Sequence, residues 1–172
     1  NRESIRIDRL TPEILESFDL IFLDSESLSG LSASELKNLE QSCREGLGAI
    51  LFINSTDTKN KIPLLNASAS TYAQDTVRLK GTTTGFVLPA TPVSIVTSAV
   101  TTPIIISSNR TLSGFVNVGA GKIGFQLLHE TYPLLLEGKE SDYASLWSPL
   151  LEATTRLKPQ RFKIQLENKF PY

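Results

Sequence analysis

A glycine-rich stretch late in the chain has the spacing of a nucleotide-binding loop. Gly119, Gly121 and Gly124 form the pattern G-x-G-x-x-G, whose backbone amides can receive a pyrophosphate at the start of a helix. That chemistry needs a strand before the glycines and a helix beginning near Gly121. Here apolar and polar residues alternate both in 115–118 and in 123–127, which is the pattern of two strands. The sequence therefore predicts a β-hairpin that turns at the glycines, and a nucleotide loop is the weaker alternative.

The chain has one cysteine and one histidine, Cys43 and His129. Cys43 falls near the expected C-terminus of a helix, on the apolar face with Leu36 and Leu39, where the helix dipole disfavours a thiolate. We therefore interpret it as a small buried hydrophobic residue rather than a nucleophile. His129 stands at the end of a predicted strand, and no pattern ties a nucleophile to it. One cysteine and one histidine cannot form a structural zinc site, so we expect no metal and no cofactor.

Polar side chains follow the predicted buried strands, at the edge of an open α/β sheet where ligands usually bind. These weak candidates for a ligand site are Asp24, Glu26, Ser55, Asp57 and His129. The same residue types also cap helices and close turns, so an ordinary structural role is the alternative interpretation. A true site would require these groups to converge on one concave pocket.

The first third of the chain has the pattern of a βαβ unit. Residues 20–23 are a continuous apolar run, as in a strand of a parallel sheet that is buried on both faces. Ser32 and Glu35 have the spacing of a capping box at the start of a helix. A second apolar run, residues 49–53, completes the unit, and such crossovers are right-handed almost without exception.

The remaining elements are less regular. We expect a short strand at Ile5 and Ile7, a β-rich stretch over 85–128, and helix over 131–156. The alternating residues 161–167 predict one more strand. We assign residues 1–158 to one α/β domain and residues 159–172 to a strand or linker that leads toward a following module.

Composition excludes some partners. Seventeen basic and 18 acidic residues give a net charge of −1, and no basic run is interleaved with aromatic residues, so we expect no nucleic-acid binding. No stretch approaches the roughly 18 apolar residues of a membrane span, so we expect no membrane insertion by this fragment. The chain begins with Asn1 and contains no methionine, which we interpret as a piece of a longer protein.

The patterns of residues 18–53 and 119–154 together resemble those of a known family, the class I glutamine amidotransferase-like domain of large bacterial membrane proteins. Residues 18–53 have its strand ending in Asp, its L-S-x-x-E-L helix start and its buried second strand. Residues 119–154 have its closing pattern, with Gly138, Tyr143 and Trp147 at the positions of G-x-x-x-x-Y-x-x-x-W. The resemblance implies a three-layer, flavodoxin-like α/β fold with a β-rich second half. It also implies an extracytoplasmic location and, as partners, other domains of the same polypeptide or a membrane protein complex.

The same resemblance argues against catalysis. Working members carry a cysteine in a G-x-C-x-G turn after a strand, and an H-x-E further along the chain. Here residues 54–59 follow the second buried strand without a cysteine, and His129 is followed directly by Glu130 and Thr131. We therefore expect a non-catalytic domain with a structural or protein-interaction role. The alternative is a small-ligand binder or hydrolytic enzyme that uses the strand ends near Asp24, Ser55 and His129.

Overall fold

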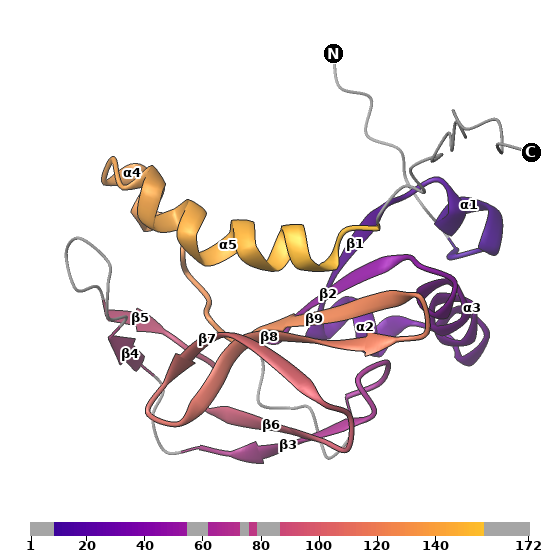
Figure 1. Cartoon of the computed structure of the whole chain (residues 1–172), viewed down its shortest axis with the longest axis horizontal. Helices are drawn as coiled ribbons and strands as arrows, with labels where there is room; N and C mark the ends of the chain where they lie inside the picture. Colours follow the sequence, from indigo (N-terminus) through magenta and orange to yellow (C-terminus); the bar gives the residue numbers. More distant parts are fainter. Residues whose placement is uncertain (1–8, 55–61, 73–75, 79–86, 157–172) are drawn as a thin grey trace, which may run out of the picture.

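Five strands form the central sheet of the protein, which a computed structural model describes over residues 9–54, 62–72, 76–78 and 87–156 (Figure 1). The strand order is β1-β2-β9-β8-β7. In chain order these strands are β1 (Leu20–Asp24), β2 (Gly48–Phe52), β7 (Thr101–Ser107), β8 (Arg110–Val118) and β9 (Gly121–Gln126). β1, β2 and β9 run parallel, whereas β8 and β7 are antiparallel to their neighbours.

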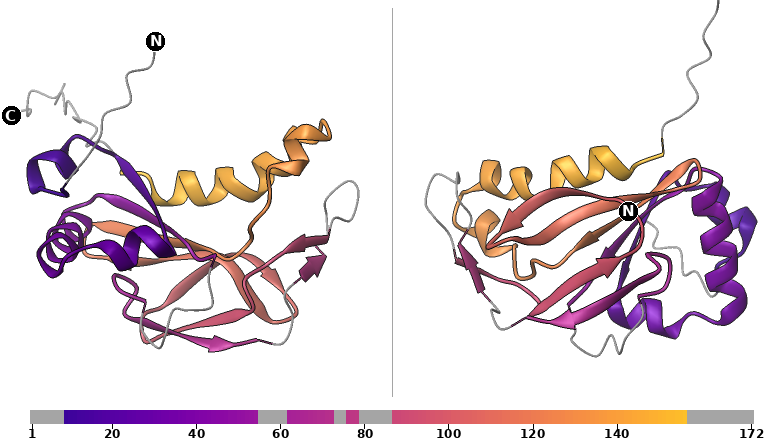
Figure 2. Two further views of the ribbon diagram at one scale, coloured as in Figure 1. Left: turned by 180° about the vertical axis from the view of Figure 1, so that it is seen from behind. Right: turned by 60° about the horizontal axis from the view of Figure 1, so that its bottom comes forward.

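Helices and a small sheet cover the two faces of the central sheet (Figures 1 and 2). α5 (Glu140–Thr154), preceded by the short α4 (Pro133–Leu136), lies across one face. The other face carries α1 (Pro12–Glu16), α2 (Ser25–Gly30) and α3 (Ala33–Arg44). Beside them on that face lies the antiparallel pair β3 (Ala67–Thr71) and β6 (Val93–Thr97). A second pair, β4 (Thr76–Arg78) and β5 (Val87–Pro89), lies near α4.

The βαβ unit predicted from the sequence is confirmed. Ser32 accepts a hydrogen bond from the backbone N–H of Glu35, and the Glu35 carboxylate accepts one from the Ser32 backbone, which closes the capping box of α3. The apolar face of α3 places Leu39 and Cys43 against the sheet, in one buried cluster with Leu51 and Phe125. Burial of this face, rather than helix propensity alone, stabilises α3.

The glycine stretch forms the predicted hairpin, and the nucleotide loop is excluded because a strand begins at Gly121. Residues 119 and 120 join β8 to β9. Gly119 has φ +61°, a conformation that side chains with a Cβ adopt at a cost. A Cβ at Gly121 would lie 2.2 Å from the carbonyl oxygen of Cys43, so only glycine fits there. The glycines let the hairpin approach the end of α3.

The predicted α/β class is confirmed, and the β-rich second half is present as β5 to β9. The finer flavodoxin-like layering is not shown: the sheet is mixed, and β3 and β6 occupy part of one helical layer. The expected strands at Ile5 and Ile7 and at 161–167, with the linker 159–172, lie outside the described residues. Within the described ranges, no helix has the length and apolar character needed to cross a membrane.

Candidate functional site

The single thiol lies in the core of the domain. Cys43 is fully buried on the inner face of α3, near the C-terminus of that helix. Burial raises the pKa of the Cys43 thiol from its usual value of 9.0 to about 12. The thiolate that nucleophilic catalysis needs is therefore scarce at neutral pH, and solvent does not reach the sulfur. This placement agrees with the interpretation of Cys43 as a small buried hydrophobic residue.

Asp24 and Glu26 lie at the carboxyl end of β1. The Asp24 carboxylate accepts a hydrogen bond of 2.7 Å from the backbone N–H of Ser27 and so caps α2. The side chain and backbone of Ser27 hold the pKa of Asp24 below its ordinary value of 3.8. Glu26 is exposed in the first turn of the same helix. The capping role, one of the two interpretations of Asp24, is thus observed.

His129 lies beyond the end of β9, on a segment that leaves the parallel strands. Its backbone N–H donates to the carbonyl of Pro89 at 3.1 Å, and the neighbouring Leu128 bridges to Ala90. The imidazole is half-buried. Among the residues that the structure describes, no hydrogen bond or ion pair joins any two of Asp24, Glu26 and His129. Ser55 and Asp57 lie outside the described residues, so convergence of the five candidates stays a prediction.

No metal site emerges from the described part of the chain. No group of three or more histidine, cysteine, aspartate or glutamate side chains in these ranges is arranged to hold an ion. The expectation of no metal remains a prediction for the chain as a whole.

A buried arginine near the end of β2 was not anticipated from the sequence. Arg110, at the start of β8, is 2% exposed and donates to the carbonyl of Thr91 at 2.7 Å. Thr91 in turn donates its hydroxyl to the carbonyl of Ile53 at 2.5 Å. The guanidinium also lies 4.8 Å from the centre of the Tyr72 ring, a cation–π distance. Burial lowers the pKa of Arg110. These contacts join β2, the segment before β6, and β8, which is a structural role.

Trp147 is the centre of an aromatic group on the α5 face of the sheet. Its ring centre lies 6.3 Å from those of Phe22 and Phe52, and 6.4 Å from that of Tyr143. The indole N–H donates to the hydroxyl oxygen of Thr131 at 3.2 Å. Trp147 and Tyr143 therefore pack against the sheet, as their helical spacing predicts. Phe22, by contrast, is 52% exposed at the β1 edge of the group.

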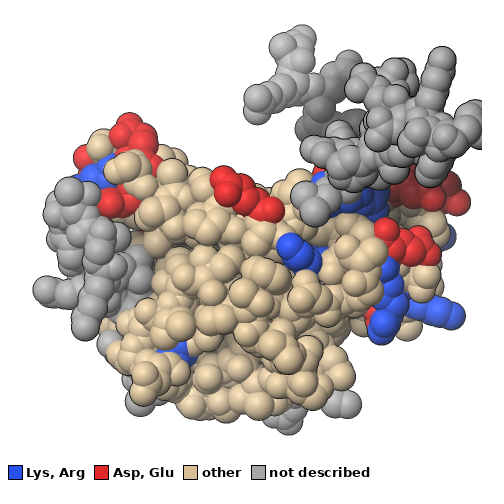
Figure 3. All heavy atoms as spheres, viewed as in Figure 1, with Lys and Arg blue, Asp and Glu red and all other residues tan. Residues whose placement is uncertain are grey.

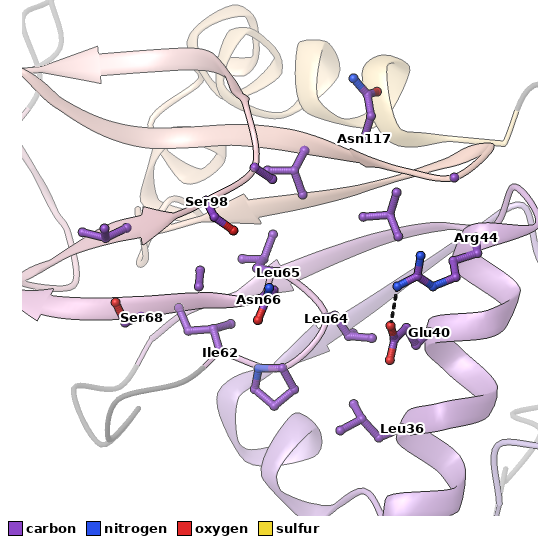
Figure 4. Close-up of a pocket in the computed structure, with 17 residues that line it drawn as sticks. Leu36, Glu40, Arg44, Ile62, Leu64, Leu65, Asn66, Ser68, Ser98 and Asn117 are labelled. Atoms are coloured by element: carbon purple, nitrogen blue, oxygen red, sulfur yellow. Dashed lines mark hydrogen bonds and ion pairs between the residues drawn. The ribbon is translucent and has the colours of Figure 1, made fainter.

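A groove of about 950 Å³ separates α3 from the β3–β6 pair (Figure 4). Leu36, Glu40 and Arg44 line the helix side, where Glu40 and Arg44 form an ion pair of 2.8 Å. The opposite wall is the segment 62–68 with the end of β6, and Asn117 lies toward the β8–β9 hairpin. The described residues that line this groove include no aromatic side chain on which a sugar or base could stack.

The groove borders a surface on which the described residues carry no charge, and we call it the uncharged face. It is formed by β3, β6 and β7, and residues 62–72 and 87–109 contain no Asp, Glu, Lys or Arg. Figure 3 shows the corresponding lower part of the molecule almost free of charge, while acidic and basic side chains gather near the ends of the helices. Large apolar side chains are exposed here: Val96 at 56%, Val100 at 86% and Ile106 at 59%.

The sequence contains a signal for this face, although no chemical motif marks it. The signal is the long absence of charge in chain that is otherwise 20% charged. Ser and Thr keep such strands polar, so hydropathy alone does not reveal the surface.

Comparison with known proteins shows similarity in fold only. No protein-family model and no curated protein sequence matches the chain. Two solved structures from Salmonella typhimurium are similar over most of it. Cytoplasmic Protein STM3548 is 13% identical with a TM-score of 0.59, and the match covers 88% of this chain and 77% of that one. Cytoplasmic Protein STM1381 from strain LT2 is 14% identical with a TM-score of 0.56, covering 86% and 76%.

A third similar structure belongs to a much longer enzyme, the exo-beta-1,4-mannosidase Op5Man5 from Opitutaceae bacterium strain TAV5. It is 18% identical with a TM-score of 0.52, and the match covers 83% of this chain but only 26% of the enzyme. The extracytoplasmic location expected from the family resemblance is contradicted by the two Salmonella proteins, which are both named cytoplasmic. That expectation came from the resemblance alone, since nothing in the residues themselves encodes location. The comparisons thus support the α/β fold and withdraw the extracytoplasmic assignment.

Proposed function

We propose that this chain is a non-catalytic, glutamine amidotransferase-like domain that binds another domain of the same polypeptide through its uncharged face. The observation that carries the proposal is the surface formed by β3, β6 and β7. Its segments 62–72 and 87–109 carry no charged residue, and it exposes Val96, Val100 and Ile106. Depletion of charged residues is what distinguishes the core of a protein–protein interface from the rest of a surface.

The position of Cys43 supports the non-catalytic part of the proposal. A thiol with a pKa near 12, enclosed between α3 and the sheet, is poorly suited to attack a substrate carbonyl. The hairpin at Gly121 closes against the same turn of α3, so the backbone next to the thiol is covered as well. The family resemblance remains a proposal, and it rests on the sequence patterns of residues 18–53 and 119–154.

Hydrogen exchange tests the interface. We would compare amide exchange in residues 62–72 and 87–109 between the isolated chain and the longer protein that contains it. The proposal predicts at least about tenfold slower exchange in these segments in the longer protein, and equal exchange in α5. Ile106→Lys in the longer protein should abolish the difference because it places a charge in the interface. The matched control is Leu136→Lys on α4, which is 80% exposed and lies away from the uncharged face.

Equal exchange in the isolated and longer proteins would contradict the interaction role. Hydrolysis of glutamine by the purified chain, lost in Cys43→Ala, would contradict the non-catalytic role. The two results are independent, so each part of the proposal can fail alone.

The strand-end site is a second candidate function, and one observation favours it. Asp24, at the end of β1, lies at the carboxyl edge of the parallel strands, where ligands bind in open α/β sheets. Titration of the chain with small carboxylic acids and amino acids, followed by NMR shifts of Asp24 and His129, would test it. Joint shifts of both residues in the presence of one ligand would support this candidate over the interface.

A further inference from the structure

A second pocket, separate from the groove beside α3, lies at the amino ends of the parallel strands. Its volume is about 380 Å³, within the size range of small-molecule sites. Helices α3 and α5 both end at it: Glu45 and Gly46 follow α3, and Thr154 and Thr155 close α5. Gly121, the first residue of β9, is also part of its lining. The ends of two helices and the start of a strand therefore meet at this pocket.

Close approaches between backbones fix the walls of this pocket. A Cβ on Gly48, at the start of β2, would lie 2.0 Å from the carbonyl oxygen of Thr154, so β2 contacts the end of α5. Gly121 makes the corresponding approach to the carbonyl oxygen of Cys43, so the hairpin contacts the end of α3. Walls that depend on backbone contacts of this kind do not rearrange with a side-chain rotamer. The pocket is therefore pre-formed, as small-molecule sites usually are.

The pocket carries both signs of charge. Its charged residues, among those described, are Glu16, Glu45, Lys122 and Arg156. The C-terminal ends of α3 and α5 add partial negative charge. The Lys122 ammonium lies 5.1 Å from the centre of the Phe115 ring, so it has a cation–π partner of its own. A ligand with a single charge would meet repulsion as well as attraction here, so the pocket favours a molecule that also carries both signs.

Arg156 supplies a hydrogen-bond donor to this pocket. Its backbone N–H donates to the carbonyl of Asp19 at 2.9 Å, which anchors the residue before the start of β1. A Cβ on Gly46 would lie 4.0 Å from the Arg156 Nε, so the guanidinium lies against the end of α3. Among the described residues, this buried Nε has no hydrogen-bond partner, and no ion pair joins Arg156 to Glu16 or Glu45. A guanidinium in this state is suited to hold a carboxylate through two parallel N–H groups.

The carboxylates of the pocket call for a positive group on the same ligand. Glu16 ends α1 and Glu45 follows α3, and both residues are exposed. An ammonium group is favoured beside two carboxylates and the C-termini of two helices. We propose that this pocket binds a free α-amino acid, whose carboxylate accepts from the Arg156 guanidinium and whose ammonium lies toward Glu45. Because Glu45 directly precedes Gly46, which the guanidinium approaches, a small zwitterion can meet both groups at once.

NMR titration of the chain with L-alanine tests the proposal, with propionate and ethylamine as matched probes. Propionate lacks the ammonium group of alanine, and ethylamine lacks its carboxylate. We expect saturable shifts of the Gly46, Gly121 and Thr155 amides with alanine, and at least about tenfold weaker binding of each other probe. Equal affinity for the three probes, or no saturable shift in the pocket, would overturn the proposal. Shifts confined to Asp24 and His129 would also overturn it, since they would place the amino acid at the opposite edge of the sheet.

Substitutions separate the two ends of the ligand. Arg156→Gln should weaken alanine binding at least about tenfold, and Arg156→Lys should also weaken it, because lysine keeps the charge but lacks Nε and the planar fork. Glu45→Gln should weaken the binding of alanine and leave that of propionate unchanged. The matched control is Arg44→Gln, which removes a positive charge from the exposed side of α3, outside this pocket, and should bind as the natural chain does.

Circular dichroism establishes that each variant is folded. If Arg156→Gln does not fold, Glu45→Gln decides, because its side chain is exposed and its loss leaves the core intact. A folded Arg156→Gln or Glu45→Gln variant with the alanine affinity of the natural chain would overturn the proposal.

Discussion

Gly121 lies against Cys43, so close that a Cβ on the glycine would come within 2.2 Å of the cysteine's carbonyl oxygen. Next to it, the backbone N–H of Ala120 donates to the carbonyl of Arg44 at 2.8 Å. The β8–β9 hairpin thus closes the C-terminal end of α3 and donates a hydrogen bond to one of the carbonyls that every helix end leaves without an intrahelical partner. The stretch with the spacing of a phosphate loop instead packs the β8–β9 hairpin against the end of α3.

Gly121→Ala should destabilise the protein by about 2 kcal/mol, because the backbone of α3 or of the hairpin must move to admit the methyl group. Gly30→Ala is the matched control, since a Cβ at Gly30 meets nothing within 4 Å. Urea unfolding followed by circular dichroism measures both changes. If the two variants were equally stable, the close approach of the hairpin to α3 would be wrong.

The buried thiol predicts a particular dependence of stability on alkaline pH. The pKa of Cys43 is raised to about 12 in the folded protein, against the usual value of 9.0 that it regains in the unfolded chain. Between these values the folded state keeps a proton that the unfolded state loses, so stability falls as pH rises, by up to about 1.4 kcal/mol per pH unit. Denaturant unfolding at pH 8, 9 and 10 should show a shallower fall in Cys43→Ala. Parallel curves for the two proteins would contradict the burial of the thiol.

The Asp24 cap of α2 predicts how stability changes at acidic pH. Because the pKa of Asp24 is lowered, its contribution is present above about pH 3.9, the unfolded value, and is lost as pH falls through the folded value. At pH 7, Asp24→Ala should cost about 1 kcal/mol, while Asp24→Asn keeps the acceptor for the Ser27 N–H and should cost less. The stability gap between Asp24→Ala and the natural chain should narrow as the pH falls toward 2, because the protonated carboxyl keeps only a neutral acceptor. A gap of the same size at pH 2 and pH 7 would mean that the charge of the carboxylate does not contribute to the cap.

The hydrogen bond from Trp147 to Thr131 ties α5 to the segment that follows β9. A double-mutant cycle with Trp147→Phe and Thr131→Val should give a coupling free energy of about 1 kcal/mol, because each variant removes one partner of the 3.2 Å bond. Unfolding can be followed by circular dichroism, which does not need the tryptophan. Strict additivity of the two single changes would show that the bond does not contribute to stability.

Local patterns in the sequence predicted the parallel half of the fold well. The two strands follow from the apolar runs at 20–23 and 49–53, and the start of α3 follows from the capping box at Ser32. Each of these patterns involves residues only a few positions apart. The hairpin at Gly119 was predictable for the same reason, because alternation and turn chemistry are local. Cys43 could be placed in the core because its helical phase with Leu39 fixes the face that it occupies.

The arrangement of the second half depends on contacts between distant residues, which a single sequence does not display. Nothing near β3 indicates that it pairs with β6, about 25 residues later, and takes part of a helical layer. Arg110 reads as an exposed strand residue until Thr91 and Tyr72 are brought to it. The candidate site is harder still. Asp24 caps a helix. Ligand binding would use the same type of residue at the same strand end, so the sequence alone cannot distinguish the two roles.

Chemical modification of Cys43 tests the central claim of a non-catalytic domain most directly. The native chain would be incubated at pH 7.5 with a glutamine-derived electrophile and, separately, with iodoacetamide, and its intact mass would be measured over hours. The buried, protonated thiol predicts no adduct with either reagent in the native protein, and one adduct with iodoacetamide after unfolding in urea. Saturable formation of a glutamine-analogue adduct on Cys43 of the folded chain would contradict the claim.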